Sequence, residues 1–163
     1  MKIKKLTLVL IYDSEKILLG MKKRGFGVGK WNGFGGKVEK GENILDSAKR
    51  ELFEESNLEI KSDRDIKKRG VISFRFEDNP KKILEVNYFS IDSDKIIGTP
   101  KETEEMMPKW FKLNKIPYDK MWLDDADWMP LLLAGKNFKG DYLYLEDGSK
   151  ILQKKLEIAG DLT

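Results

Sequence analysis

Two residue types are missing from this chain of 163 residues, which contains no cysteine and no histidine. Without cysteine there is no disulfide framework, no thiolate nucleophile and no thiolate-ligated metal site. Without histidine there is no Ser-His-Asp triad, no imidazole base and no imidazole-ligated metal. Any catalysis must therefore use carboxylates, lysine, tyrosine, hydroxyl groups or backbone amides, with or without an oxygen-ligated cation such as Mg2+.

Long apolar runs are also missing. Residues 1–5 make a basic start, but the apolar run behind them is short, alternates like a strand and lacks a cleavage site of small residues. No signal peptide is therefore expected. No stretch approaches the roughly 20 residues that span a bilayer. We expect a soluble, cytoplasmic protein with no membrane partner.

Internal repeats, low-complexity tracts and proline-rich linkers are absent, and the five prolines are scattered. Because a domain holds about 100–200 residues, we expect one domain, residues 1–163. The 31 basic and 28 acidic residues leave a formal net charge of +3. That near balance, with no long basic stripe, argues against a nucleic-acid polymer as the main partner.

Alternating and β-branched apolar runs predict strands along most of the chain. Turn residues at 13–14, 78–80 and 147–148 separate three pairs of them, and the turn at 78–80 predicts a hairpin. The predicted strands cover residues 6–12, 16–21, 71–76, 83–91, a short stretch at 110–111, and a closing pair at 142–145 and 150–158.

Two segments are predicted to be helical. Residues 43–56 place four apolar side chains on one face, and Asn57 ends the helix because asparagine tolerates a left-handed conformation. Residues 125–133 form the second helix, with Pro130 in its first turn or kinking it. Strands outnumber helices and hairpins are more evident than βαβ units. The fold class is therefore α+β, with a mixed or antiparallel sheet.

The first helix carries an acidic face. Glu51, Glu54 and Glu55 stand at i, i+3 and i+4, so their side chains converge although like charges repel. A divalent cation would reverse that penalty, and three carboxylates on one helix are suitable ligands for Mg2+. Arg50 can pair with Glu42 or Glu54 and hold the cluster in register. The alternative interpretation is a solvated face rich in glutamate and lysine.

The sequence around this helix, GKVEKGENILDSAKRELFEESNL at 36–58, resembles the Nudix box, G-x5-E-x7-R-E-U-x-E-E-x-G-U, in which U is a bulky aliphatic residue. Asn57 departs from the pattern, which has glycine there. Because asparagine also reaches positive φ, we expect the turn to survive at a cost of about 1 kcal/mol. The matching residues are Gly36, Glu42, Arg50, Glu51, Leu52, Glu54, Glu55 and Leu58.

Segments outside the box, at 20–37, 97–106, 121–133 and 138–145, are similar to the animal-type oxidised purine nucleoside triphosphatases of the Nudix family. This resemblance implies a Nudix fold, with a mixed sheet between helices in an α/β/α arrangement. It also implies Mg2+-dependent hydrolysis of modified purine nucleoside triphosphates to the monophosphate and pyrophosphate. Substrates such as 8-oxo-dGTP or 2-hydroxy-dATP, Mn2+ as a substitute metal, a role in nucleotide-pool sanitation and a monomeric state follow from the same resemblance.

The resemblance also assigns site residues. Glu51, Glu54, Glu55 and the backbone carbonyl of Gly35 would bind the metal, and Glu105 would be a further ligand or a base. Glu55 and Glu54 are the preferred candidates for the general base, and Lys22 and Lys37 would meet phosphate. The implied substrate pocket comprises Thr7, Phe26, Asn32, Phe34, Gly35, Gly36, Phe74, Trp122, Leu123, Asp124 and Asp125, with Leu84, Met106 and Tyr144 near its wall.

Each assignment has a plainer alternative. The glycine-dense stretch at 24–36 can be an ordinary loop, and the Phe and Met residues are individually typical of a core, to which we assign Trp128. Thr7 on a strand can be a satisfied hydroxyl. Asp124 and Asp125 precede or begin the second helix and can simply cap it.

Three functions remain open from the sequence. Besides the modified-purine triphosphatase, the chain can be a Nudix hydrolase of another pyrophosphate, such as a dinucleoside polyphosphate or nucleotide sugar, or a non-enzymatic nucleotide or RNA binder. The acids beside Trp122, with Asn32, favour the first, because recognition of phosphate alone needs no reader of a base edge. We expect Asp124 and Asp125 to share a proton, so that the pocket accepts more than one modified purine and excludes unmodified dGTP and dATP.

Overall fold

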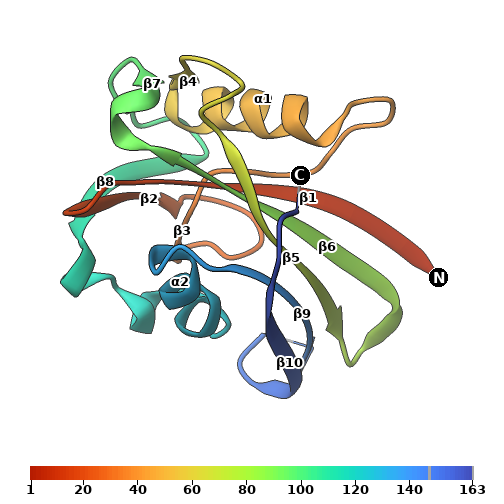
Figure 1. Cartoon of the computed structure of the whole chain (residues 1–163). Helices are drawn as coiled ribbons and strands as arrows, with labels where there is room; N and C mark the ends of the chain where they lie inside the picture. The colour runs from red at the N-terminus through yellow and green to blue at the C-terminus, as the bar shows by residue number, and fades with distance from the viewer. Residues whose placement is uncertain (147, 163) are drawn as a thin grey trace.

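The computed structural model describes residues 1–146 and 148–162, which form a mixed sheet with one long helix on each face (Figure 1). The sheet has eight strands in the order β10-β9-β5-β6-β1-β2-β3, and β8 also pairs with β2. The strands are β1 (Lys2–Tyr12), β2 (Lys16–Lys22), β3 (Trp31–Asn32), β5 (Lys67–Phe76), β6 (Asn79–Asp92), β8 (Met106–Lys112), β9 (Asn137–Tyr144) and β10 (Ile151–Ala159).

The centre of the sheet is the parallel pair β1–β6, in register from Lys2↔Lys82 to Tyr12↔Asp92. β5 and β9 are also parallel, whereas the other pairs of this sheet are antiparallel. Val9, Leu10 and Ile11 in β1 are fully buried, because the sheet is covered on both faces at this point. The mixed sheet confirms the α+β class.

Helix α1 (Ile44–Ser56) begins one residue later than predicted and ends at Ser56 as predicted. Asn43 caps it, its side chain accepting a hydrogen bond from Asp46 N at 2.8 Å. At the other end Asn57 has φ 67° and ψ 19°, and its N–H donates to Phe53 O at 2.8 Å. The left-handed conformation expected for Asn57 is therefore confirmed.

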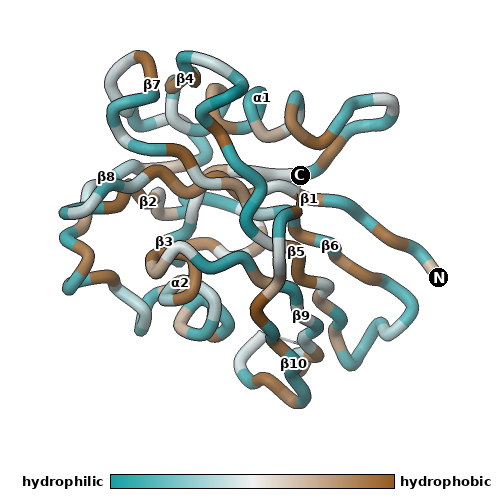
Figure 2. Tube along the Cα trace, in the orientation of Figure 1, coloured by the Kyte–Doolittle hydropathy of each residue, from teal (hydrophilic) through white to brown (hydrophobic). Residues whose placement is uncertain are grey.

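Two hydrophobic cores lie on opposite faces of the sheet. Val9, Ile11 and Leu18 pack with Ala48 and Leu52 of α1. Their neighbours on the same strands point the other way and pack with α2 (Asp125–Leu133), where Trp128 is fully buried as predicted. Figure 2 shows hydrophobic stretches along the strands between the two helices. The two cores confirm the α/β/α arrangement.

Several details differ from the sequence prediction. The β5–β6 turn lies at 77–78, one residue earlier than predicted, because Phe76 already pairs with Asn79. Pro80 is tolerated inside β6 since β1 joins that strand only from Lys82 onward. Pro130 lies in the second turn of α2, not the first. In the closing turn, predicted at 147–148, Asp147 lies outside the described residues.

The remaining elements are short. β4 (Glu59–Ile60) and β7 (Ile96–Ile97) form a separate two-stranded sheet beside the C-terminus of α1. Three 3-10 turns, η1 (Ser93–Lys95), η2 (Leu113–Lys115) and η3 (Tyr118–Lys120), join longer elements. Across residues 1–146 and 148–162, no helix has the length and apolar character needed to cross a membrane.

Candidate active site

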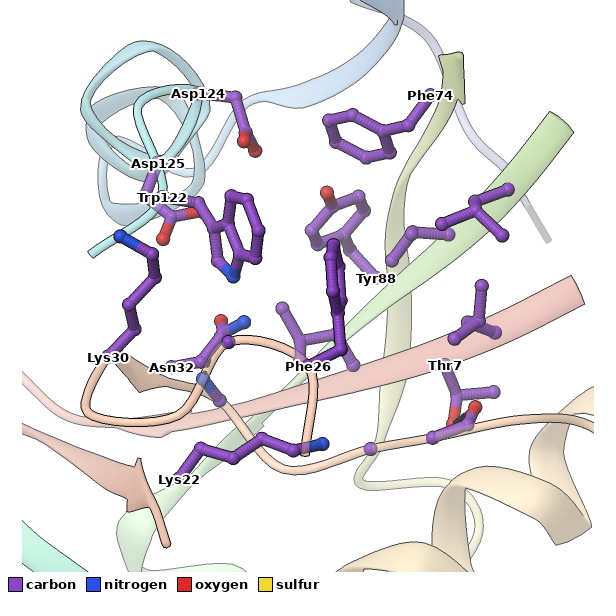
Figure 3. A pocket seen from close by; sticks show the side chains of 18 of the residues that line it. Thr7, Lys22, Phe26, Lys30, Asn32, Phe74, Tyr88, Trp122, Asp124 and Asp125 are labelled. Carbon is purple, nitrogen blue, oxygen red and sulfur yellow. Dashed lines mark hydrogen bonds between the residues drawn. The ribbon is translucent and has the colours of Figure 1, made fainter. Parts of the chain in front are cut away.

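A cavity of about 210 Å3 opens on the α2 side of the sheet, between the strands, the glycine-dense loop and the start of α2 (Figure 3). Its walls are largely apolar and come from β1, β5, β6 and β9 together with two rings that meet across the opening. Those rings are Phe26, which is 63% exposed, and Trp122, with centroids 5.0 Å apart. Such faces suit a flat aromatic ligand.

Two adjacent acids, Asp124 and Asp125, line the end of the cavity at the start of α2, and they are 4% and 2% exposed. Burial raises the pKa of both carboxyls, and the neighbouring charge of Asp124 raises the pKa of Asp125 further. Asp124 precedes the helix but makes no side-chain capping bond. The plain helix-cap interpretation of Asp124 is therefore wrong.

The remaining polar groups at the cavity are few. Asn32 Oδ1 accepts from Gly33 N at 2.9 Å, which leaves the amide nitrogen of Asn32 for a ligand. Thr7 is buried, and its hydroxyl lies 3.5 Å from Gly36 O. Lys30 also lines the cavity, and its Nζ lies 5.2 Å from the Trp122 ring centroid.

The acidic face of α1 borders the same cavity through Glu55, which is 5% exposed. Glu55 Oε1 accepts from Gly35 N at 2.8 Å. Burial raises the pKa of Glu55 to about 8, and the charges of Glu51 and Glu105 add to the effect. Burial also raises the pKa of Glu51. A carboxylate cluster of this kind gains stability from any cation placed against it.

Arg50 holds this face together. Its Nε and Nη2 donate to the two carboxylate oxygens of Glu42 at 2.8 and 3.0 Å. Its Nη1 donates to Glu51 Oε1 at 3.0 Å and lies 3.3 Å from Glu54 Oε2. Arg50 thus forms both of the pairs that the sequence left as alternatives.

Glu105 approaches from the segment just before β8 and is bound to Arg24, whose Nη2 donates to Glu105 Oε1 at 2.6 Å. The charge of Lys22 partly offsets the burial that raises the pKa of Glu51 and Glu55, and it adds to the hydrogen bond from Arg24 that lowers the pKa of Glu105. In the described ranges, no three acidic side chains are close enough together to form a metal cluster. The carboxylates of Glu51 and Glu54 are bound to Arg50, and that of Glu105 is bound to Arg24.

The donor set nevertheless fits a hard divalent cation. All the candidate ligands are oxygens, and Glu55 is a buried carboxylate that accepts a hydrogen bond from the backbone amide of Gly35. Gly35 lies against β1, because a β-carbon there would come within 1.8 Å of Thr7 O. Only glycine permits that approach, which brings the loop backbone beside the glutamates.

Three predicted substrate-binding residues lie outside the cavity, as do the predicted catalytic or metal-binding residues Arg50, Glu51, Glu54 and Glu105. Phe34 is fully buried in the core beneath α1, so its side chain is assigned to that core and not to a ligand. Lys37 is exposed and lies near Lys4, whose pKa it lowers, and Leu123 is 46% exposed. The other predicted pocket residues line the cavity: Thr7, Lys22, Phe26, Asn32, Gly35, Gly36, Phe74, Leu84, Met106, Trp122, Asp124, Asp125 and Tyr144.

The sequence interpretation missed eight lining residues, which are Leu6, Leu8, Gly27, Lys30, Gly33, Phe76, Val86 and Tyr88. Val86 and Tyr88 follow Leu84 at a spacing of two on β6, so strand alternation from Leu84 could have identified them. Lys30 sits between glycine and tryptophan in a loop, where no periodic pattern marks it.

Comparisons with known proteins agree with this geometry. A family model described as a NUDIX domain matches residues 3–132. A Mus musculus protein named oxidized purine nucleoside triphosphate hydrolase is 50% identical over 150 residues, 92% of each chain. A Danio rerio protein of the same name is 46% identical over 159 residues, covering 98% of this chain and 97% of its own. A mutator MutT protein from Bacillus halodurans has a similar crystal structure, with a TM-score of 0.80 at 24% identity, covering 94% and 97% of the two chains.

Proposed function

Because the chain belongs to the Nudix family, we propose that it hydrolyses modified purine nucleoside triphosphates, such as 8-oxo-dGTP or 2-hydroxy-dATP, to the monophosphate and pyrophosphate. One observation carries the proposal: Asp124 and Asp125 line the same cavity as Glu55. A nucleotide in that cavity presents its base to the acids of α2 and its phosphates to the glutamates of α1. The biological role proposed is sanitation of the nucleotide pool.

Mg2+ is the proposed cofactor, with Mn2+ as a substitute. When bound, the cation neutralises phosphate oxygens and orients or acidifies the attacking water. The residues proposed to hold it are Glu51, Glu54, Glu55, Glu105 and the backbone carbonyl of Gly35.

The chain's own side chains perform the proton and charge chemistry. The oxygen of a water molecule attacks a phosphorus atom, the P–O bond to pyrophosphate breaks, and a carboxylate accepts the proton of the water. Glu55 and Glu54 are the proposed bases, because an ionised carboxylate beside the phosphates can accept that proton. Lys22 offers positive charge to the phosphates, and Arg50 keeps Glu51 and Glu54 in place.

The proposed partner is a small nucleotide and not a nucleic-acid polymer or a membrane. We propose that the enzyme acts as a monomer of one domain. The proposed place of action is the cytoplasm, where such nucleotides are substrates.

A substrate panel tests the proposal. Purified protein is given 8-oxo-dGTP, 2-hydroxy-dATP, dGTP, dATP, a dinucleoside polyphosphate and a nucleotide sugar, with Mg2+ or with EDTA, and released pyrophosphate or phosphate is measured. We expect the modified purine triphosphates to be cleaved fastest and EDTA to abolish cleavage. Faster cleavage of the dinucleoside polyphosphate or nucleotide sugar would assign the chain to a different Nudix substrate class.

A further inference from the structure

Tyr144 on β9 is bonded twice to one residue of the acid pair. Its hydroxyl donates to Asp124 Oδ1 at 2.5 Å and accepts from Asp124 N at 3.0 Å. Since the backbone N–H occupies a lone pair of the hydroxyl oxygen, the single hydroxyl proton points at the carboxylate. The ring of Tyr144 stacks on Phe76 at 5.8 Å and meets the edge of Trp122 at 6.0 Å, which fixes its position.

The two acids differ in the hydrogen-bond donors that face their carboxyl oxygens. Asp124 receives a second donor, because Trp128 Nε1 lies 2.9 Å from its Oδ2. Asp125 Oδ2 is buried and has no hydrogen-bond partner within residues 1–146 and 148–162. Donors stabilise the ionised form of the group that they bind, whereas a buried oxygen without a donor favours the protonated form.

We infer that Tyr144 is a specificity-determining positioning residue, which together with Trp128 keeps the negative charge on Asp124 and the proton of the pair on Asp125. The directions of the pKa shifts agree, because the pKa of Asp125 is raised more strongly than that of Asp124. The pair therefore presents a fixed donor beside a fixed acceptor, and not a freely exchanging proton.

A fixed pattern selects among purines. A 6-oxopurine edge carries the O6 acceptor beside the N1–H donor, which complements a protonated Asp125 beside an ionised Asp124. A 6-aminopurine edge places a donor where O6 would be, and so meets the proton of Asp125 unfavourably. The inference therefore predicts that the enzyme prefers oxidised guanine over oxidised adenine nucleotides. This prediction of substrate preference rests on the proposed function.

The other ionisable groups around the pair do not compete for the proton. Burial raises the pKa of the neighbouring tyrosines, so they stay neutral near pH 7; these are Tyr88 of β6, Tyr118 of η3, and Tyr142 and Tyr144 of β9. Asp127 of α2 is bound to Tyr142 and to Lys154 of β10. Lys30, from the loop before β3, lies over Trp122.

The first test measures protonation directly. Carbon-13 NMR of the aspartate carboxyls follows the pair in the free protein from pH 4 to 9, in the wild type, Tyr144→Phe and Tyr142→Phe. Tyr142 is a matched control because it lies on the same strand but donates to Asp127 Oδ2, at 2.8 Å. We expect Tyr144→Phe to raise the lower pKa of the pair by about one unit and Tyr142→Phe to leave it unchanged. The same lower pKa in all three proteins overturns the inference.

Assignment of the two pKa values comes from Asp124→Asn and Asp125→Asn. We expect the lower transition to be lost in Asp124→Asn and the upper one to be lost in Asp125→Asn. These variants also keep the test decisive if Tyr144→Phe folds poorly, since an asparagine retains an oxygen that accepts from Tyr144 and Trp128. The opposite assignment of the transitions contradicts the inference.

The second test measures selectivity. The ratio of kcat/KM for 8-oxo-dGTP over 2-hydroxy-dATP is expected to fall about tenfold in Tyr144→Phe and to stay within twofold in Tyr142→Phe. Equal ratios in all proteins overturn the role of Tyr144 in specificity. If the wild type cleaves neither nucleotide, the proposed function fails, whereas the NMR titration still decides whether Tyr144 sets the proton.

Discussion

Gly36 lies directly against the carboxylate of Glu51, and a β-carbon on Gly36 would come within 2.5 Å of Glu51 Cδ. Gly36 has no positive φ, so its backbone alone does not require glycine. The requirement is steric. The loop after β3 passes so close to α1 that a side chain at position 36 would collide with the carboxylate of Glu51, which is bound to Arg50. The glycine therefore determines where a candidate metal ligand points.

Gly36→Ala is accordingly expected to impair activity more than stability. The added methyl group displaces the Glu51 side chain, which can swing toward solvent, so we expect kcat to fall about tenfold or more while the protein still folds. Gly160→Ala is the matched control, because nothing lies within 4 Å of its β-carbon position. Steady-state kinetics and urea unfolding of both variants decide the point. Normal kcat in Gly36→Ala would show that the position of Glu51 is not critical.

Glu55→Gln separates catalysis from stability. With Mg2+ we expect kcat to fall about a hundredfold or more, because the amide cannot accept the proton of the water. In EDTA the same variant is expected to be more stable than the wild type. The pKa of Glu55 in the folded state, about 8, lies above its value in the unfolded chain. Ionisation of the buried carboxyl therefore lowers the free energy of unfolding of the wild type as the pH rises from about 4.5 to 8.

The measurement for this prediction is urea unfolding in EDTA at pH 5 and pH 8. The free energy of unfolding of Glu55→Gln is expected to exceed that of the wild type only slightly at pH 5 and by at least about 1 kcal/mol at pH 8. Glu104→Gln, at an exposed position, serves as the control for a simple change of charge. A gain that is equal at both pH values would mean that burial does not raise the pKa of Glu55.

Glu42→Gln tests the ion pair with Arg50. Arg50 lowers the pKa of Glu42 to about 2, below its unfolded value, so the pair stabilises the fold above about pH 4.5 and is lost as pH falls toward 2. The variant is expected to be less stable than the wild type at pH 6. The difference in free energy of unfolding between the two proteins is expected to disappear as the pH falls to about 2. Urea midpoints at several pH values measure it. Glu39→Gln, 3.9 Å from Arg50 in the wild type, is expected to show a much smaller gap.

Asn57 tests the end of α1. Because φ is 67° there, Asn57→Gly is expected to be neutral or slightly stabilising, whereas Asn57→Val is expected to cost about 1–2 kcal/mol. Thermal or urea unfolding of the two variants gives the comparison. The wild-type rate should be retained in Asn57→Gly, since Asn57 is not among the residues that line the cavity. Equal stability of the glycine and valine variants would contradict a left-handed backbone conformation at residue 57.

Local features were predictable from the sequence because local physics determines them. The apolar face of α1 and the left-handed Asn57 both depend on residues within one or two turns. The glutamate spacing is of the same kind, since a helix fixes which side chains share a face.

Features that depend on distant neighbours were not predictable in the same way. The sequence does not mark Phe34 as core, because burial beneath α1 is decided by how the loop passes over β1. Arg69 is a second example: it is 8% exposed and donates to Asn137, Tyr12, Ser90 and two carbonyls at the end of α2. Those partners lie on five separate elements or loops, so no short pattern reveals that Arg69 anchors α2.

The two cores on opposite faces of the sheet give this fold a route for evolutionary change. Neighbouring residues of β1 and β2 alternate between the cores, so Leu10 packs with α2 whereas Ile11 packs with α1. Substitutions around α2 can therefore change the base-binding end of the cavity while the packing beneath the candidate glutamates of α1 is preserved. A lineage can in this way acquire a new nucleobase preference without rebuilding its phosphate chemistry.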